Sequence, residues 1–372
     1  MARKTSPAET LSPRALNRAL LARQMLIERA AMPVLAAIEH LVGLQAQVPT
    51  DPYLALWSRI ANFDPHELSA LIEKRKAVRL AAQRGTLHLL SARDALPMRR
   101  LVQPVLTRMG ASQDFGRKTR GVDIETLVAA GRALVAKEPK TMAELRPLLA
   151  EKFPEYDGAS LAQRFHYHAP LVQVPPRGLW GQGGAPRITT GEQWLKARGK
   201  AAASPEKIVL RYLAAFGPAS VMDAQAWSGL TKLAPVFEKL RKKIVVFRDD
   251  KGRELFDLPD APRPDEDTPA PPRFLPVYEN AVLGFANRDR IINAKPKKPP
   301  PDNAWVKTFL LDGFVAGFWK ISEEKDAAML LLEPFGRITK KDQAALTAEG
   351  MRLLDFAAPE VKRKKVRVGP AR

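Results

Sequence analysis

Two glutamines interrupt the first apolar stretch of the sequence. In LVGLQAQVPTDPY, residues 41–53, Gln45 and Gln47 flank an alanine and Asp51 follows. A carboxamide accepts hydrogen bonds through its oxygen and donates through its nitrogen, so it can hold a water molecule without being a strong base. In an extended segment the two side chains would point the same way and could hold one water together. Asp51 is the alternative group for activating that water, because a carboxylate is the better base.

Taken alone, the same spacing also fits two solvent-exposed residues at the end of a helix, which is the commoner case. A second polar pattern lies in RGTLHLL, where Arg84, Thr86 and His88 alternate with apolar neighbours. These three side chains would share one face of a strand. For His88 the pattern predicts a structural hydrogen bond more often than a contact to substrate.

Other chemistry is not indicated. Cysteine is absent, which excludes disulfides, thiolate zinc sites and a cysteine nucleophile. The sequence has no Walker A loop, HExxH or GxSxG motif. His166 and His168 are two residues apart on a predicted helix and would point to different faces, so we do not expect a metal site there. We expect neither a metal nor a cofactor.

The formal net charge is +20 and the sequence pI is near 10.2. Such an excess attracts polyanions, so nucleic acid is the first partner to consider and an anionic membrane surface the second. A basic but inert surface is the alternative. No apolar stretch reaches the ~18 residues of a membrane span, and the N-terminus lacks the apolar core of a secretory signal. We therefore expect a cytoplasmic, nucleoid-associated protein.

The periodicity and the turn residues predict an α+β fold with three tandem winged-helix modules. Residues 203–259 are the clearest: three helices, the first closed by Gly217 as a left-handed cap and the second ending near Gly229, precede a hairpin around residues 250–252. Residues 120–195 repeat this plan. Residues 11–110 hold a less regular copy with the Gln-x-Gln motif, in which AVRLAAQRGTLHLLS is one strand candidate and Gly85 a bulge or close-approach point.

The remaining segments are of other kinds. Residues 260–273 are rich in proline and charge and predict a linker. Residues 274–361 predict an α+β region with a hairpin at Asp312-Gly313 and a helix capped by Thr339. Residues 362–372 are expected to form a mobile basic tail.

Three winged helices with this charge favour duplex DNA as the partner. Arg84 and Thr86 are candidates for contacting it. Trp180 could present its ring to a groove or lie buried in the module core, and the sequence favours neither interpretation over the other. The other candidate DNA-binding residues are Arg164, Arg177, Lys239, Arg241, Lys242, Arg288 and Arg290.

Four segments together resemble one known family: LVGLQAQVPTDPYLALWSRI, RGTLHLLSARD, LVQVPPRGLWGQGG and YENAVLGFANRDRII. They look like the winged-helix DNA-binding family of alkylpurine DNA glycosylases, whose AlkZ- and YcaQ-like members unhook DNA interstrand crosslinks. The resemblance runs from about residue 11 to the final predicted helix, with the motifs in family order. It implies a concave basic channel around duplex DNA and a catalytic Gln-x-Gln motif matching Gln45 and Gln47.

The last segment departs from the family's usual FDNLLLSHADRSRI: Glu279 is one methylene longer than the usual aspartate, and Asn287 replaces a carboxylate. The resemblance predicts a monofunctional glycosylase that releases N7-alkylated guanine. The alternatives are a non-enzymatic winged-helix transcriptional regulator, reading bases through Gln163 or Arg164, and a scaffold that masks lesions without cutting. Nothing in the sequence requires a dimer, and we expect a monomer without an obligate protein partner.

Overall fold

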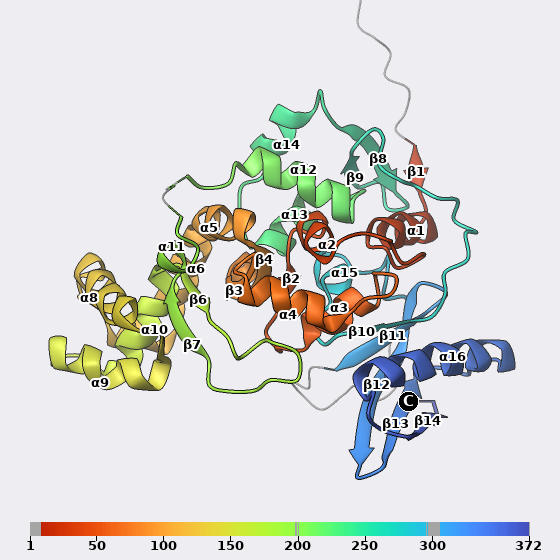
Figure 1. Cartoon of the computed structure of the whole chain (residues 1–372). Helices are drawn as coiled ribbons and strands as arrows, with labels where there is room; N and C mark the ends of the chain where they lie inside the picture. The colour runs from red at the N-terminus through yellow and green to blue at the C-terminus, as the bar shows by residue number, and fades with distance from the viewer. Residues whose placement is uncertain (1–8, 198, 200, 295, 297–305, 372) are drawn as a thin grey trace, which may run out of the picture.

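The computed structural model describes residues 9–197, 199, 201–294, 296 and 306–371. Three winged-helix modules and a C-terminal α+β region are present, which confirms the α+β fold predicted from the sequence. We number the winged-helix modules 1 to 3 in chain order. In Figure 1, module 1 (orange and red) lies between module 2 (yellow) on one side and the C-terminal sheet (blue) on the other. Module 3 (green) lies against module 1.

Module 1 contains both polar patterns singled out in the sequence. Ser12 caps its first helix by accepting a hydrogen bond from the Ala15 amide at 3.0 Å. The predicted single strand at residues 77–91 is in fact two antiparallel strands joined by a turn at Gly85. The elements are α1 (Pro13–Arg23), α2 (Val34–His40), β2 (Leu44–Gln45), α3 (Asp51–Trp57), α4 (Pro65–Glu73), β3 (Ala77–Ala81), the 3-10 turn η1 (Gln83–Gly85) and β4 (Leu87–Ser91).

Module 2 follows a connection of three helices, α5 (Ala92–Leu101), α6 (Gln103–Ser112) and α7 (Asp114–Lys118). Thr141 and Glu144 form a capping box at the start of α9 (Met142–Lys152). One six-stranded sheet, in the order β2-β4-β3-β6-β7-β5, runs through modules 1 and 2 and fixes their relative position. The elements of module 2 are β5 (Lys140–Thr141), β6 (Leu171–Gln173), β7 (Arg187–Thr190), α8 (Ile124–Lys137), α9 (Met142–Lys152), α10 (Gly158–His168) and α11 (Gly191–Trp194).

Module 3 has the predicted three helices and hairpin, and β1 (Thr10–Leu11) adds to the hairpin in parallel. Ser220 and Asp223 form a capping box at the start of the second helix, and Gly229 is a left-handed cap with φ of 79°. The prediction for Gly217 is wrong, because its φ is −65°. The elements are α12 (Pro205–Phe216), α13 (Val221–Ser228), α14 (Ala234–Leu240), β8 (Val245–Asp249) and β9 (Glu254–Asp257).

The C-terminal region is a five-stranded sheet in the order β10-β11-β12-β13-β14. Thr339 caps its long helix as predicted, accepting from the Asp342 amide at 3.1 Å. The expected mobile tail is instead largely an edge strand, β14, parallel to β13. The elements are β10 (Arg273–Leu275), α15 (Asn280–Leu283), β11 (Lys307–Leu311), β12 (Phe314–Glu324), β13 (Ala327–Pro334), α16 (Lys340–Ala357) and β14 (Arg363–Val368).

The proline-rich segment between β9 and β10 has no helix or strand. It nonetheless lies against α1, since Arg18 donates to the Thr268 carbonyl at 2.6 Å and Arg14 to the Glu266 carbonyl at 2.8 Å. Both donors are side chains bonded to main-chain oxygens, so the segment is held in place rather than acting as a free spacer.

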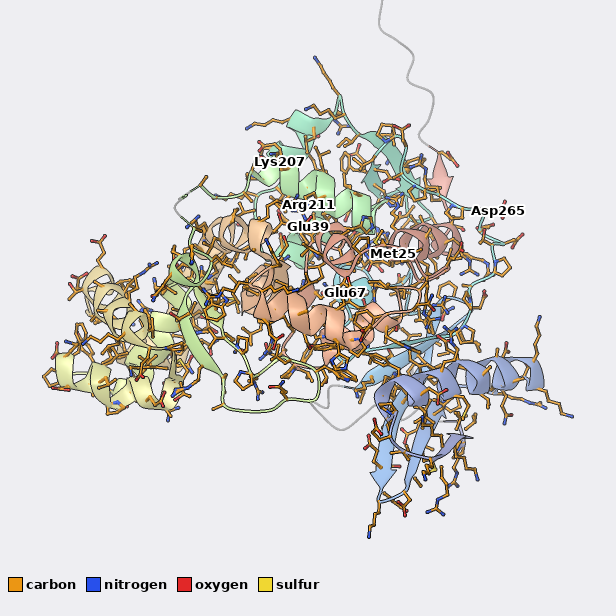
Figure 2. The ribbon with its side chains drawn as sticks, in the orientation of Figure 1. Met25, Glu39, Glu67, Lys207, Arg211 and Asp265 are labelled. Atoms are coloured by element: carbon orange, nitrogen blue, oxygen red, sulfur yellow. The ribbon has the colours of Figure 1, made fainter. Side chains whose placement is uncertain are left out.

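Polar side chains of modules 1 and 3 meet across their contact. Figure 2 shows Arg211 of α12 beside Glu39 of α2, and Arg211 donates to the Glu39 carbonyl and to Asp94, each at 2.6 Å. Arg23 of α1 forms a two-pronged ion pair with Asp257 of β9, at 2.6 and 2.8 Å, and both side chains are completely buried. A Cβ at Gly217 would lie 2.6 Å from the Arg23 guanidinium, so glycine is required there to admit this pair.

Asp257→Asn should lower the free energy of unfolding by about 3–5 kcal/mol, because it leaves the buried Arg23 without its counter-charge. Urea denaturation monitored by circular dichroism measures the change. Glu238→Gln is the control: it breaks an exposed pair with Arg241, worth only about 0.2–1 kcal/mol. Equal effects of the two substitutions would contradict a structural role for the buried pair.

Candidate active site

The Gln-x-Gln segment is extended, not the end of a helix. After α2, Val42 and Gly43 have φ of 56° and 93°, and this turn leads the chain into β2. A Cβ at Gly43 would lie 2.5 Å from Leu90, so only glycine allows the turn to pack against β4. Gln45 is paired with His88 in the β2–β4 register. The strand pairing thus brings together the two polar patterns of the sequence.

Both glutamine side chains are fixed through their oxygens. Gln45 is buried, with 5% of its surface exposed, and its Oε1 accepts from Arg84 Nη2 at 2.6 Å. Gln47 is exposed, and its Oε1 accepts from the Leu87 amide at 3.3 Å. Because both partners are donors only, the amide orientation follows from chemistry. Each NH2 group, and the second lone pair of each oxygen, can therefore serve a ligand.

Arg84 connects Gln45 to module 3. Its Nη1 donates to the Trp227 carbonyl at 2.6 Å, in the last turn of α13, where the helix dipole favours a cation. Its backbone is left-handed, with φ of 55° and ψ of 13°. A non-glycine residue in this region costs about 1–3 kcal/mol, which surrounding contacts must offset. Burial lowers the pKa of Arg84 to about 10, with a smaller contribution from Arg288, so the side chain stays charged at neutral pH.

Two further residues, neither of them predicted from the sequence, hold the segment. Arg79, on the apolar strand β3, donates to the Ala46 carbonyl at 2.8 Å between the two glutamines. Asn280 donates to the Gly43 carbonyl at 3.0 Å. The sequence does contain a sign of Arg79's role, because it is a single arginine within an apolar strand. Arginine is almost never fully buried without a partner, so this position indicates a hydrogen-bonded guanidinium.

His88 is neutral. It is 1% exposed, and its Nδ1 lies 3.0 Å from the Thr86 carbonyl, which places the proton on Nδ1. Burial, and then the charge of Arg84, lower its pKa to about 3. Its Nε2 is buried and has no hydrogen-bond partner among the described residues. This arrangement favours the structural interpretation of His88 over direct contact with substrate.

Asp51 is not grouped with the glutamines. It begins α3, is 1% exposed, and its carboxylate faces the Val277 and Tyr278 amides and the ammonium of Lys307. These amides complete no hydrogen bond of ordinary geometry with the carboxylate oxygens. Burial raises the pKa of Asp51 to about 6, and the amides and Lys307 offset this only in part.

The candidate DNA-binding residues divide by exposure. Lys239, Lys242 and Arg288 are exposed, and Lys239 lies 3.7 Å from a Glu206 carboxylate oxygen. Arg241 is exposed too but is paired with Glu238 and Glu254. Arg177, half-buried, donates to the Gly184 carbonyl at 2.9 Å.

Three other candidates are partly or fully enclosed by neighbouring elements. Trp180 packs between Tyr53 and Phe356, with ring centroids at 5.1 and 5.0 Å, so the core interpretation applies. Arg290 is 6% exposed and donates to the Pro218 carbonyl at 2.6 Å. Arg164, on α10, has its Nε and Nη1 buried. Arg290 is thus buried, whereas Trp180 and Arg164 are half-buried.

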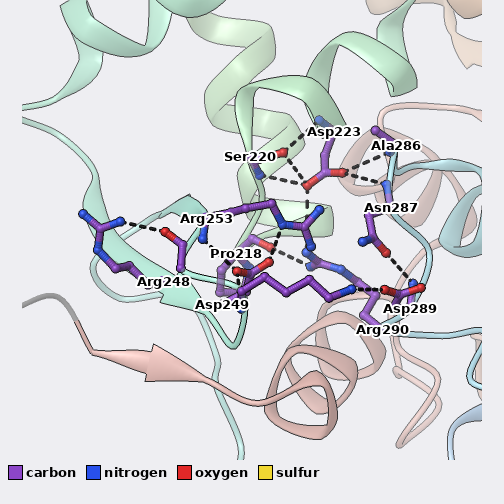
Figure 3. Close-up of polar contacts among 12 residues, drawn as sticks. Pro218, Ser220, Asp223, Arg248, Asp249, Arg253, Ala286, Asn287, Asp289 and Arg290 are labelled. Carbon is purple, nitrogen blue, oxygen red and sulfur yellow. Dashed lines mark hydrogen bonds and ion pairs between the residues drawn. The ribbon is translucent and has the colours of Figure 1, made fainter.

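The two departures from the family pattern keep their hydrogen bonds. Glu279 caps α15 and pairs with the buried Arg59 at 2.6 and 3.2 Å. Figure 3 shows the surroundings of Asn287, whose Oδ1 accepts from the Asp289 amide at 2.8 Å. An aspartate oxygen could accept the same bond, so the amide does not change this turn.

Within the described part of the chain, no group of three or more histidine, aspartate or glutamate residues could hold a metal ion. None of the described helices is both long and apolar enough to cross a membrane.

The fold and the site define a tandem winged-helix protein whose Gln-x-Gln segment is held by hydrogen bonds from neighbouring side chains. The family model described as DNA glycosylase AlkZ-like matches residues 38–356. The chain belongs to this AlkZ-like DNA glycosylase family.

The chain is similar in sequence and in structure to glycosylase from Streptomyces sahachiroi. It is 26% identical over 339 residues to an interstrand DNA cross-link repair glycosylase, covering 84% of this chain and 88% of that protein. The solved structure of the DNA glycosylase AlkZ matches with a TM-score of 0.70 at 18% identity, covering 97% of this chain and 100% of that chain. The second comparison shows likeness of fold.

The raised pKa of Asp51 predicts that its ionisation lowers the free energy of unfolding as the pH rises. Between its ordinary value of 3.8 and about 6, the folded protein binds more protons than the unfolded chain, so this contribution to stability falls as pH rises. Asparagine cannot ionise. The free energy of unfolding of the wild type minus that of Asp51→Asn should therefore decline by about 2.4 kcal/mol from about pH 4 to about pH 7.

Urea denaturation at several pH values measures this difference. Asp250→Asn, at an exposed turn, controls for the substitution itself. A wild-type minus Asp51→Asn difference that does not change with pH would contradict the raised pKa.

Proposed function

We propose that this protein is a monofunctional DNA glycosylase that hydrolyses the N-glycosidic bond of N7-alkylated guanine, including guanine in interstrand crosslinks. The observation that carries the proposal is the Gln45–Ala46–Gln47 segment, fixed by contacts from Arg84, Arg79 and Asn280 in a member of a DNA glycosylase family. The name of the cross-link repair relative supports the crosslinked substrate.

The chemistry asks little of the protein. Alkylation at N7 gives the base a positive charge, so the bonding electrons of the C1′–N9 bond pass to the base and it leaves neutral. No general acid is needed. The sugar develops oxocarbenium character, and a water oxygen bonds to C1′ while its proton passes to solvent. The protein must position this water and tolerate a cationic sugar, and two carboxamides are adequate for the first task.

The two glutamines differ in their proposed roles. Gln47 is exposed and its NH2 group can bind water or substrate directly. Gln45 lies deeper and is held by Arg84. Asp51 is the better base by type, but its carboxylate faces residues 277–278 and Lys307. We therefore assign the water-positioning role to the glutamines and treat His88 as structural support.

An exposed catalytic group also suits a crosslinked base. Ordinary base flipping carries the target nucleotide about half a turn out of the helix, which a base tethered to the opposite strand cannot follow. We infer that the exposed Gln47 reaches such a base close to its position in the duplex. Exposed cations, among them Lys239, Lys242 and Arg288, supply sequence-independent affinity for phosphates. The protein would act as a monomer in the cytoplasm.

The regulator alternative has less support. It requires base-reading side chains on the third helix of a module, and Arg164 on α10 has two of its three guanidinium nitrogens buried. A regulator would bind one sequence strongly and release no base, and a lesion-masking scaffold would bind damaged DNA and leave it intact. Mass spectrometry of bases released from methylated and mustard-crosslinked DNA distinguishes the three functions.

Gln47→Ala should reduce single-turnover excision of 7-methylguanine by about 10²–10³-fold, the size of effect seen when one preorganised polar group is removed from an active site. Gln45→Ala should reduce it by a similar factor. Release of free base is measured by mass spectrometry at saturating enzyme, with Asp51→Asn as the comparison. Full activity of Gln47→Ala would remove the proposed mechanism, and loss confined to Asp51→Asn would transfer the role to the carboxylate.

Arg84 acts through Gln45, so it is a positioning residue. Lysine keeps the charge but cannot contact Gln45 and the Trp227 carbonyl with one planar group. Arg84→Lys should lower the single-turnover excision rate about 10–100-fold while leaving affinity for undamaged duplex within about threefold. Arg288→Gln, which removes a neighbouring exposed cation, should show the reverse: weaker binding and an unchanged rate at saturation. Parallel losses of binding and rate in Arg84→Lys would contradict this role.

A further inference from the structure

The C-terminal strand separates its side chains by charge. Along β14 the exposed residues are Arg363, Lys365 and Arg367, and the half-buried ones alternate with them. Val366 packs near Gly350 of α16. Because strand side chains alternate between faces, the three exposed cations lie on the sheet face opposite α16, about 6.6 Å apart along the strand.

The same face carries a further cation and a groove. Lys320 of β12 is exposed and lies in the same cross-strand row as Arg367, through Leu331 of β13. A groove of about 600 Å³ runs along the edge, lined by Met329 and by basic residues that include Lys362 and Lys365. Glu324 is the acidic residue lining it.

These cations are not neutralised by neighbours. Lys364, on the opposite face, pairs with Asp355 at 2.9 Å. Among the ion pairs of the described residues, none involves Arg363, Lys365, Arg367 or Lys320. Four unpaired cations on one sheet face produce a positive potential that attracts polyanions.

A simpler explanation exists for charges on an edge strand. Lysines there prevent edge-to-edge pairing with another chain. That function needs charge on β14 itself and does not account for Lys320 on β12, which is interior to the sheet. It also predicts aggregation, rather than loss of ligand binding, when the charges are removed.

The cationic face is distinct from the candidate active site. Lys307 of β11, which faces Asp51, is the cross-strand partner of Trp319 of β12, and Trp319 packs in the core formed with α16. Because cross-strand partners share one face of a sheet, Lys307 lies on the α16 side and the four cations lie on the other.

We propose that the sheet face formed by Lys320, Arg363, Lys365 and Arg367 binds the phosphate backbone of duplex DNA, as a contact surface separate from the glutamine segment. The contact needs no alkylated base, so undamaged duplex is its ligand as well.

The test is the triple variant Arg363→Gln/Lys365→Gln/Arg367→Gln. Affinity for an undamaged duplex of about 25 base pairs should fall at least tenfold, and the slope of log Kd against log salt should fall by about 3, one for each lost phosphate contact. Fluorescence anisotropy at several salt concentrations measures both. The control is Arg337→Gln/Lys340→Gln/Lys341→Gln, which removes the same net charge from exposed positions at the start of α16.

The double variant Arg363→Lys/Arg367→Lys should keep the salt slope, because lysine also neutralises a phosphate. Thermal unfolding checks that all variants fold. Equal losses in the triple variant and its control would overturn the proposal, as would unchanged binding with new aggregation. Retained duplex binding with loss of binding to single-stranded DNA or to an acidic protein would also overturn it, by assigning another occupant. The excision rate at saturating enzyme is read separately, so failure here leaves the proposed glycosylase activity intact.

Discussion

The Arg84 guanidinium is the interaction on which the candidate site depends. It is held in a left-handed turn and donates both to the last turn of α13 and to Gln45. Arginine has donors and no acceptor, so it determines which end of the Gln45 amide faces inward. Module 3 therefore controls the orientation of a side chain in module 1. A weakly polar group such as glutamine gains catalytic value only when its position is fixed, because it offers neither charge nor strong basicity.

Several of the positively charged side chains lie in the interior of the protein rather than on its surface. Arg23, Arg59 and Arg290 are buried and bonded to carboxylates or carbonyls. The formal charge of +20 counts them equally with exposed lysines. Composition therefore identified a polyanion as partner but not the side chains that meet it. Burying arginine with a bidentate partner joins modules at fixed angles, and a rigid arrangement of modules keeps exposed cations at constant spacing.

Local patterns in the sequence predicted most of the helices and hairpins. Capping residues such as Ser12, Thr141 and Thr339 act within a few residues of the chain, so their effect can be read directly. Pairings between distant strands were not predicted. The β3–β6 and β13–β14 pairings depend on which edges meet in the folded chain, and the pattern of a short basic strand is the same as that of a tail. The glutamine pair came from family resemblance, whereas Arg79 and Asn280 act on main-chain carbonyls and leave no spacing pattern.

The segment around residues 278–280 explains why a lengthened carboxylate can be tolerated near the site. Glu279 accepts hydrogen bonds from Arg59 and from the Ala281 amide in the first turn of α15, and the neighbouring Asn280 donates to the Gly43 carbonyl. The contribution of this segment to the site is the hydrogen bond from Asn280 to the Gly43 carbonyl. This bond holds the turn that leads into β2, where Gln45 pairs with His88. An aspartate at position 279 is one methylene shorter. To keep the bond with Arg59, the backbone at that position and the Arg59 guanidinium would have to lie closer together. Side-chain length and backbone position can therefore change together while the glutamine segment keeps its geometry. The departure at Glu279 is thus a difference in how the site is supported, not in the groups it presents.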